Sequence, residues 1–466
     1  MATLRTRNGA LLLKQESVPG TYEAPDPATD GILVEAPTIN PTTQNVETDE
    51  VQGSLDSTAP IVGGMQVTIG GAFYLKGPGV PGEYPEWDLL MRIAGMAATQ
   101  TRTDITGVTF SVTGASAEIA DSGDGLAALT VGTVIHVSGF ANEANNGEFI
   151  VTTSAAGAIV VARLTGATAM VDEAAGENVT LRRGIAAVEA TAGGVDSITL
   201  QAPWANTAQL YRGMPVALSG NPAAPYISQI LDYTAGRVAT LADYFETPLS
   251  ASTVASIPAN IRYAPASSSI PAASVTLYMD GVVYRCTGAK ATLSIEQTAG
   301  GAARCTYTIS ALMHEKDDAA VPSVTYDGTR PGIWRNSAML VNKRRAALQT
   351  LSVDLGNEVI FPPDPNGQEG FDAPIITRRR MTGSMDPNAT LVATRDLMTA
   401  FRDGTAQPVA ARLAGGSAAR PGQRVGLAIP SALYTSYQPG DRQGVQTEQI
   451  GFFLQGQDSG LFLQVW

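Results

Sequence analysis

Histidine and cysteine, the side chains most often used for acid–base, nucleophilic or zinc chemistry, are scarce in this 466-residue chain. It contains two histidines, His136 and His314, and two cysteines, Cys286 and Cys305. Two cysteines are too few for a disulfide framework, so we expect free thiols on strands. The common nucleotide-binding, metalloprotease, zinc-binding and nucleophile-elbow motifs are also missing from the sequence. The sequence therefore predicts a protein that is not an enzyme and that uses no metal and no cofactor.

Carboxylates are plentiful, but their spacing does not define a site. The stretches DSGDG (121–125) and DPNGQEGFD (364–372) lack the ligand spacing of a calcium loop, so we interpret them as acidic turns. A pair of carboxylates suited to glycoside hydrolysis is neither predicted nor excluded, because 43 acidic residues supply such pairs by accident.

The most distinctive charged residues lie in one acidic and two basic runs. The acidic run VETDE (46–50) belongs to a long polar stretch between strands, and long loops of this kind usually carry contacts. The basic runs are NKRRAA (342–347) and TRRRMTGS (377–384). A net charge of −13 disfavours a clamp on nucleic acid, while solvated surface charge remains an alternative explanation. We predict that these runs pair between neighbouring subunits. The residues assigned to this contact are Glu47, Asp49, Glu50, Arg344, Arg345, Arg378, Arg379 and Arg380.

Composition and periodicity indicate a β-rich globular protein. The chain has 48 glycines and 28 prolines, which supply many turns, and its length suits two to four domains. Apolar residues alternate from Met65 to Leu75, which predicts a long half-buried strand. The pair Asp280-Gly281 between two apolar runs predicts a tight hairpin. No apolar run approaches the roughly 20 residues of a membrane-spanning helix, so we predict no membrane contact.

Two short helices are expected among the strands. In YPEWDLLMRIAGM (84–96) apolar residues recur with helical spacing. In DPNATLVATRDLMTAFRDG (386–404) we expect a cap at Asn388 or Thr390. The buried face predicted for this second helix consists of Leu391, Leu397, Met398 and Phe401.

The composition changes abruptly in the middle of the chain. No lysine occurs between Lys76 and Lys290. Residues 104–265 contain six arginines against fourteen aspartates and glutamates. This stretch is also rich in Ala, Thr, Gly and Val, so its composition differs from that of the segments on either side.

An internal repeat lies within this middle stretch. GTVIHVSG (132–139) and GMPVALSG (213–220) are 81 residues apart, and each precedes an alternating strand and a glycine-centred turn. Chance similarity between Gly- and Ala-rich strands is the alternative. We predict two consecutive small all-β domains, which end on the strands ENVTLRR and ANIRYAP.

Segments on both sides of the middle stretch, taken in order, resemble one known family. They are ALLLKQESVPGTYEAPDPATDGILVEAPTINP, the loop with ETDEVQG, GGMQVTIGGAFYLKGPGVPGEYPEWDLLMRIAGM, SVTLYMDGVVYRCTGAKATLSIEQTAGGAARCTYTISALM, SVDLGNEVIFPPDPNGQEGFDAPIITRRRMTGSMDP and PGQRVGLAIPSALYTSYQPGDRQGVQTEQIGFFL. Over residues 1–100 and 268–466 they are similar to the tail tube (major tail) protein of long-tailed, non-contractile bacteriophages and of gene-transfer-agent-like particles. Separately, VSGFANEANNGEFIVTT (137–153) resembles a small all-β module found in many phage virion proteins.

The resemblance implies a mainly β fold: a tail-tube-like β-sandwich or barrel with a flanking α-helix, plus two small inserted all-β domains. The composition change and the repeat place the two insertions at 104–184 and 185–265, which leaves 1–103 and 266–466 for the core. It implies homohexameric rings that stack into a tube in the virion tail, made in the host cytoplasm. The lumen would hold the tape-measure protein and conduct DNA in transit, without specific nucleic-acid binding. Tail terminator and distal tail proteins would be further partners.

The charge of the chain is compatible with such a lumen, because an acidic wall would not trap phosphate. We expect the insertions to point outward, away from the lumen and the ring faces. One alternative is a virion surface or adhesion protein whose insertions bind host-surface glycans, and another is a virion-associated hydrolase. Glycan binding would require exposed aromatic rings, whereas core packing is the competing explanation for them. The aromatic residues in question are Trp204, Tyr211, Tyr226, Tyr233, Tyr244 and Phe245.

Overall fold

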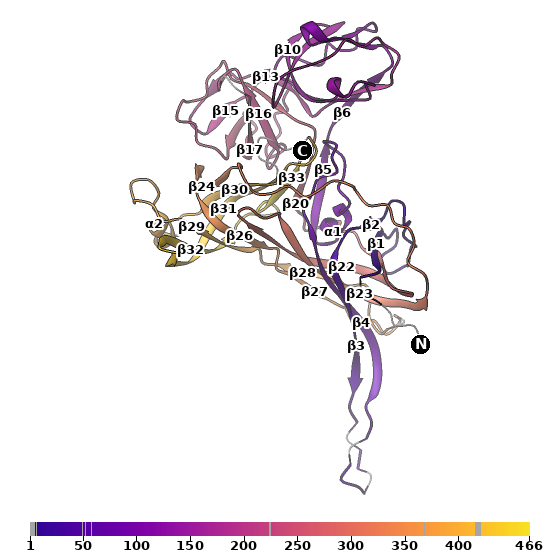
Figure 1. Cartoon of the computed structure of the whole chain (residues 1–466). Helices are drawn as coiled ribbons and strands as arrows, with labels where there is room; N and C mark the ends of the chain where they lie inside the picture. The colour runs from indigo at the N-terminus through magenta and orange to yellow at the C-terminus, as the bar shows by residue number, and fades with distance from the viewer. Residues whose placement is uncertain are drawn as a thin grey trace.

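The structure is a computed structural model that describes residues 5, 7–48, 50–51, 53–56, 58–222, 225–367, 369–414 and 421–466. Within these ranges the strands form one 17-stranded sheet, two seven-stranded sheets and one two-stranded sheet (Figure 1). Two α-helices, α1 (Asp88–Ile93) and α2 (Leu397–Arg402), accompany them. The prediction of a mainly β fold with a flanking helix is confirmed.

The large sheet takes strands from both ends of the chain. Its strands are β1 (Gly9–Gln15), β2 (Gly31–Ile32), β3 (Glu35–Val46), β4 (Ile61–Tyr74), β5 (Met96–Thr101), β20 (Asn260–Pro265), β21 (Ala273–Met279), β22 (Val282–Thr298), β23 (Arg304–Asp318), β24 (Met339–Val341), β25 (Arg344–Arg345), β26 (Leu348–Asp354), β29 (Thr382–Pro387), β30 (Gln407–Ala414), β31 (Val425–Arg442), β32 (Val445–Leu454) and β33 (Phe462–Val465). The two-stranded sheet consists of β27 (Asn357–Ile360) and β28 (Ile375–Arg379).

The large sheet folds over on itself into two layers. One layer runs in the order β3-β4-β23-β22-β26-β29-β32-β31, with antiparallel pairing throughout. β31 belongs to both layers. Its residues 432–442 pair with β32 of the first layer, whereas residues 425–432 pair with β30 and residues 425–428 with β33 of the second. The strands β24, β30, β33, β20 and β5 continue the second layer. Because the layers face each other, strands such as β23 alternate buried apolar residues with exposed or half-buried polar ones, whereas β24 and β33 are buried along their whole length.

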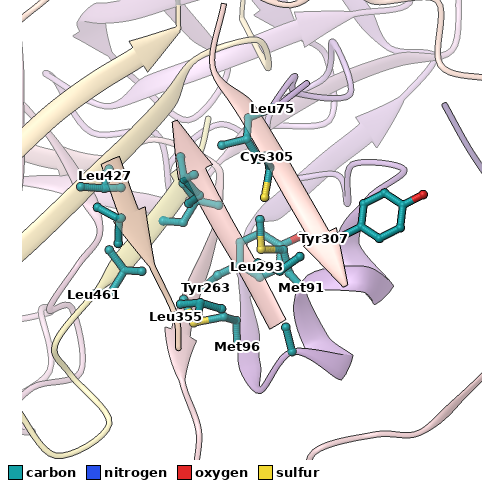
Figure 2. Close-up of a cluster of buried hydrophobic side chains, with 14 of the residues drawn as sticks. Leu75, Met91, Met96, Tyr263, Leu293, Cys305, Tyr307, Leu355, Leu427 and Leu461 are labelled. Atoms are coloured by element: carbon teal, nitrogen blue, oxygen red, sulfur yellow. The ribbon is translucent and has the colours of Figure 1, made fainter. Parts of the chain in front are cut away.

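The main hydrophobic core lies between the two layers. Figure 2 shows Met91 of α1 beside Leu293, Cys305 and Tyr263, which come from β22, β23 and β20. Trp87 precedes α1 and donates its indole N–H to the carbonyl oxygen of Lys76 at 2.8 Å. The helix predicted near residues 84–96 is therefore present and packs as core.

The two cysteines belong to this core and are both free thiols, as predicted. Burial raises the pKa of Cys286 to about 12, and it also raises that of Cys305. Neither thiol is poised to react at neutral pH.

The middle of the chain leaves the large sheet and returns to it at neighbouring strands. β5 pairs with β20 along its full length, so residues 102–259 connect two adjacent strands. They form two compact sheets, which we call the first module (103–183) and the second module (185–257). Each module has its own hydrophobic core.

The two modules share one topology. The first consists of β6 (Thr103–Gly107), β7 (Phe110–Thr113), β8 (Glu118–Asp121), β9 (Val134–Ser138), β10 (Gly147–Ser154), β11 (Ala158–Arg163) and β12 (Val179–Arg183). The second consists of β13 (Ile185–Glu189), β14 (Ala192–Gly193), β15 (Ser197–Thr199), β16 (Pro215–Ser219), β17 (Tyr226–Tyr233), β18 (Val238–Leu241) and β19 (Val254–Ile257). Numbered within each module, both sheets have the strand order 1-7-4-5-6-3-2. The repeated sequences GTVIHVSG and GMPVALSG contain the fourth strand of each, so the repeat is structural.

The end of the second repeat differs from the prediction. ANIRYAP (259–265) was expected to close it, but residues 260–265 are β20 of the large sheet. β19 occupies the position equivalent to β12. The sequence similarity between ENVTLRR and ANIRYAP therefore does not reflect equivalent strands, because β20 pairs with β5 and β33 instead.

Asparagine side chains organise the connection between β9 and β10. Asn145 is buried, and its amide nitrogen lies 2.7 Å from a carboxylate oxygen of Glu173 and 3.0 Å from the carbonyl oxygen of Val171. Asn146 accepts a hydrogen bond from the N–H of Phe140 and donates one to its carbonyl oxygen. Gly147 has φ +124° and begins β10. The Asn-Asn-Gly sequence is thus a structural hairpin connection.

The second predicted helix is much shorter than expected. Asn388 and Thr390 do not cap it; instead Asp396 caps α2 by accepting a 2.8 Å hydrogen bond from the N–H of Thr399. The preceding residues lengthen strand β29 and then form a loop. Leu397 is buried as predicted, whereas the other members of the predicted buried face are exposed. These exposed residues are Leu391, Met398 and Phe401.

Candidate assembly interface

The strands β3 and β4 form a hairpin that projects far from the body of the molecule (Figure 1). β4 pairs with β23 only from Gln66 onward, whereas its pairing with β3 continues outward to Ile61 and Val46. We call the outer part of this hairpin, residues 42–65, the arm. Both backbone edges of the arm lack a partner strand among the described residues. An arm of this kind offers unpaired N–H and C=O groups to another chain.

The arm exposes an unusual number of apolar side chains. Val51 and Leu55 in its tip are fully exposed, and the exposed apolar residues of its strands are Val46, Ile61 and Val62. Its acidic residues Glu47 and Glu50 are also exposed, as the predicted contact requires. Asp49, the third acidic residue of that prediction, lies outside the described residues. Exposed apolar side chains concentrated on a thin hairpin favour a contact with a partner chain.

The first basic run supports the second module of the same chain. Arg344 in β25 lies 3.0 Å from Glu246 and stacks over the Tyr244 ring at 4.0 Å. Its neighbour Lys343 pairs with Asp196 of the same module. Arg344 is therefore already engaged within its own chain, although sequence reasoning assigned it to a neighbouring subunit. Arg345 is exposed and lies beside Tyr226 of the second module, near the contacts that Lys343 and Arg344 make with that module.

The three arginines of the second basic run differ in burial: one is inside the chain and two are exposed. The Arg379 side chain is largely buried, and its guanidinium donates to the carbonyl oxygens of Gly95 and Ala266 at 2.9 and 3.0 Å. Burial lowers the pKa of Arg379 from its usual value. Arg378 and Arg380 are exposed. Of the five predicted arginines, Arg378 and Arg380 are thus the exposed ones that can meet a neighbour, since Arg345 contacts Tyr226 of its own chain.

The second module packs directly against the large sheet. An apolar cluster joins them, made of Leu231, Ala242, Ala338, Leu340, Ala410, Ala428 and Phe462. Gln229 of β17 donates to the side-chain oxygen of Gln464 at 3.0 Å. Arg412 of β30 lies 3.8 Å from Asp243 and 5.1 Å over the ring of Tyr226. These polar contacts cross the joint and constrain the orientation of the module.

The first module is held by a buried ion pair and by the second module. Arg424 of the loop before β31 lies 2.7 Å from Glu148 of β10, and both side chains are almost completely buried. Ser256 of the second module donates to the carbonyl oxygen of Gly132 at 3.0 Å. Both modules are therefore docked on the side of the molecule that carries β5 and β20.

The aromatic residues of the modules do not form an exposed platform. Trp204, Tyr211 and Tyr233 pack against one another in the core of the second module. Tyr226 packs edge-on against Phe245, and Tyr244 lies under Arg344. These six side chains are accounted for by core and joint packing, which leaves none of them as a stacking surface for sugars.

A second exposed apolar patch surrounds α2, and sequence reasoning missed it. It consists of Leu391, Val392, Met398 and Phe401. Helical spacing predicted a buried face here, but Leu391 and Val392 precede α2 in a loop, and Met398 and Phe401 of the helix are exposed. Exposed apolar side chains such as these favour contact with a partner.

Two further observations concern the chemistry and the environment of the chain. Among the described residues, no three His, Cys, Asp or Glu side chains gather closely enough to hold a metal ion. In the same part of the chain, no helix combines the length and the apolar character needed to cross a membrane.

The comparison with protein families decides how these surfaces are interpreted. The sequence model of the phage tail tube proteins matches residues 6–452. The chain belongs to the phage tail tube protein family. The match spans the modules as well as both flanking segments, and it confirms the resemblance carried by the flanks. A comparison with curated proteins found no match.

Family membership makes the chain a structural component of a phage tail. A tail tube protein works by associating with copies of itself, so its functional groups are those that other copies contact. In this tail tube protein the strongest candidates are the arm, the patch at α2 and the exposed arginines of the β28 region.

Proposed function

We propose that this chain is the repeating subunit of a tail tube that assembles as hexameric rings stacked around a lumen. The lumen would hold the tape-measure protein during assembly and conduct DNA during infection. Tail terminator and distal tail proteins would bind the two ends of the tube. The chain would be made in the host cytoplasm and would function in the virion tail, as a structural protein without catalysis.

The main support for this proposal is the exposed arm. Among the described residues of its own chain nothing covers Val51 or Leu55, and exposing such side chains to water is unfavourable by roughly 1.5–3 kcal/mol each relative to burial. Pro37 and Pro41 interrupt the donors of β3 near the body, so the uninterrupted edge is the outer segment, residues 42–46. Docking the arm on the next copy buries its apolar residues and pairs this edge.

Charge complements the apolar contact. Glu47 and Glu50 on the arm face solvent, and so do Arg378 and Arg380. We propose that the acidic residues of one copy meet these arginines of a neighbour. A contact between two different surfaces of the same chain is heterologous, and heterologous contacts generate closed rings or open stacks.

We also propose that the two modules are folding units inserted into the tube subunit, and that they decorate the outside of the tube. Their separate cores and shared topology support the first part. Their attachment through β5 and β20, away from the arm, supports the second (Figure 1).

Negative-stain electron microscopy of the purified chain tests the assembly proposal. Wild-type protein should form six-fold rings or tubes, and a Val51→Asp/Leu55→Asp variant should remain monomeric with an unchanged melting temperature. Val108→Asp is the matched control, because Val108 is also exposed but lies in the first module. Tubes of normal length from the double variant would contradict the role of the arm.

Charge reversal in the same assay tests the acidic–basic contact. Arg378→Glu with Arg380→Glu should weaken assembly, and Glu47→Arg with Glu50→Arg in the same chain should restore it. Assembly that is indifferent to both pairs of substitutions would refute this contact while leaving the apolar contact of the arm intact.

A further inference from the structure

A hollow lies where both modules meet the large sheet, and we call it the joint hollow. Its walls come from the loop after β11 in the first module, from the start of β17 in the second module, and from β25, β30 and the residues next to β24, β31 and β33 in the sheet. Its volume is about 230 Å³. That volume would hold roughly seven or eight water molecules, so it suits a ligand smaller than a drug-sized one.

Three arginines line the joint hollow, and two of them already face a carboxylate. Arg424 lies 2.7 Å from Glu148, and Arg412 lies 3.8 Å from Asp243. Arg345 is exposed at the rim and has no carboxylate within ion-pair distance in the part of the chain that the structure describes. The hollow therefore presents one guanidinium without a counter-charge.

A buried donor without an acceptor lines the same hollow. Trp466 is only 1% exposed, yet its indole N–H finds no hydrogen-bond acceptor among the described residues. Cζ3 and Cη2 of its six-membered ring lie so close to Gly426 that a Cβ there would meet them at 2.8 and 3.0 Å. The N–H is on the opposite edge of the indole. A buried N–H left unpaired is unfavourable, and an oxygen atom in the hollow would satisfy it.

Much of the remaining lining is apolar. Leu164 comes from the first module, Pro225 and Ile227 come from the second, and Ala338 comes from the segment before β24. Small-molecule sites combine such walls with a few polar groups that fix the orientation of the ligand. An inorganic phosphate would leave these walls unused and would lose its hydration without gaining a second free cation.

We infer that the joint hollow binds a small organic monocarboxylate with an apolar body. The carboxylate pairs with the planar guanidinium of Arg345 and accepts the N–H of Trp466, while the body fills the apolar part. One carboxylate matches the one arginine that lacks a counter-charge. The ligand touches both modules and the sheet at once, so its binding stabilises their attachment. The site does not depend on the proposed tube, because all its groups belong to one chain.

Calorimetric titration of the purified chain tests the class of ligand. Benzoate and hexanoate carry both the charge and an apolar body, acetate carries the charge alone, and benzyl alcohol carries the body alone. We expect benzoate or hexanoate to bind at least roughly tenfold more tightly than acetate, benzyl alcohol or inorganic phosphate. Benzyl alcohol or phosphate binding as tightly as the two acids would overturn the inference. Failure of both acids to bind would leave the hollow to water and would overturn it as well.

Two neighbouring arginines provide a matched pair of variants. Arg345→Met should weaken the binding of benzoate at least roughly tenfold. Arg344→Met removes an adjacent exposed arginine that does not line the joint hollow, and it should change the affinity by less than about twofold. Equal losses from the two substitutions would show attraction to the positive charge of β25 in general and would overturn the site.

The indole N–H signals of the four tryptophans report where the ligand lies. In a ¹⁵N-labelled chain, Trp466→Phe identifies the signal of Trp466. Benzoate should move this signal downfield, because its N–H gains an acceptor. The signals of Trp87 and Trp204 should stay in place, since their N–H groups already donate to carbonyl oxygens. A Trp466 signal that does not move at saturating benzoate would overturn the placement in the joint hollow.

Discussion

The buried pair Arg424–Glu148 offers the sharpest test of how the modules are attached. Two nitrogen–oxygen contacts of 2.7 and 2.9 Å join the side chains, which are only 6% and 5% exposed. Glu148→Gln keeps the shape of the side chain but removes its charge, so a buried guanidinium loses its counter-charge. Breaking a buried pair in this way costs about 3–5 kcal/mol. We expect that loss in the free energy of opening between the first module and the large sheet.

Hydrogen exchange of the β9 and β10 amides measures this opening free energy, because exchange reports local opening of a structural unit. Glu246→Gln is the matched control: it removes the partner of Arg344 in an exposed pair, where we expect less than about 1 kcal/mol. Glu148→Leu combined with Arg424→Met should recover most of the loss, since no charge then remains buried. If Glu148→Gln costs no more than Glu246→Gln, the joint is hydrated and the modules are not held as described.

Two further predictions concern individual side chains. Burial lowers the pKa of His136; Glu148 opposes this shift and Arg182 adds to it. The unfolded chain therefore binds a proton that the folded chain does not, and stability should fall as the pH drops below about 6.5. His136→Asn should flatten the pH dependence of the melting temperature between about pH 7 and 5, whereas an unchanged slope would refute this. Arg379→Met leaves the carbonyl oxygens of Gly95 and Ala266 without their donor. It should lower the free energy of unfolding, measured with denaturant, by about 2–3 kcal/mol, against less than about 0.5 kcal/mol for the exposed Arg378→Met. Equal losses would contradict the internal role of Arg379.

Local patterns determined much of the fold. Strict alternation from Met65 to Leu75 identified β4, and Asp280-Gly281 identified the β21–β22 hairpin, because both signals depend on neighbours a few residues away. The repeat at residues 132–139 and 213–220 identified two equivalent strands, since equivalent folds keep similar turn and strand residues.

Signals that depend on distant partners were ambiguous in the sequence. ANIRYAP resembled a closing strand of the second repeat, yet β5 and β33 take it into the large sheet. Arg378 and Arg379 are identical in type and adjacent, but the carbonyl oxygens of Gly95 and Ala266 make the second an internal residue. No local pattern could separate them, because their partners lie more than a hundred residues away in the chain.

The sequence by itself determined that this is a β-rich, acidic chain, poor in histidine and cysteine, with the ordered motifs of a tail tube protein. Only the tertiary structure decided which apolar residues form the core and which remain uncovered. Leu397 is buried and Met398 is exposed, although both fit the same helical pattern. The physical reason is that burial is a property of the whole assembly of elements: a side chain becomes core only where another element packs over it. Among the described residues of one chain, no such element packs over the exposed apolar side chains of the arm and of the patch at α2.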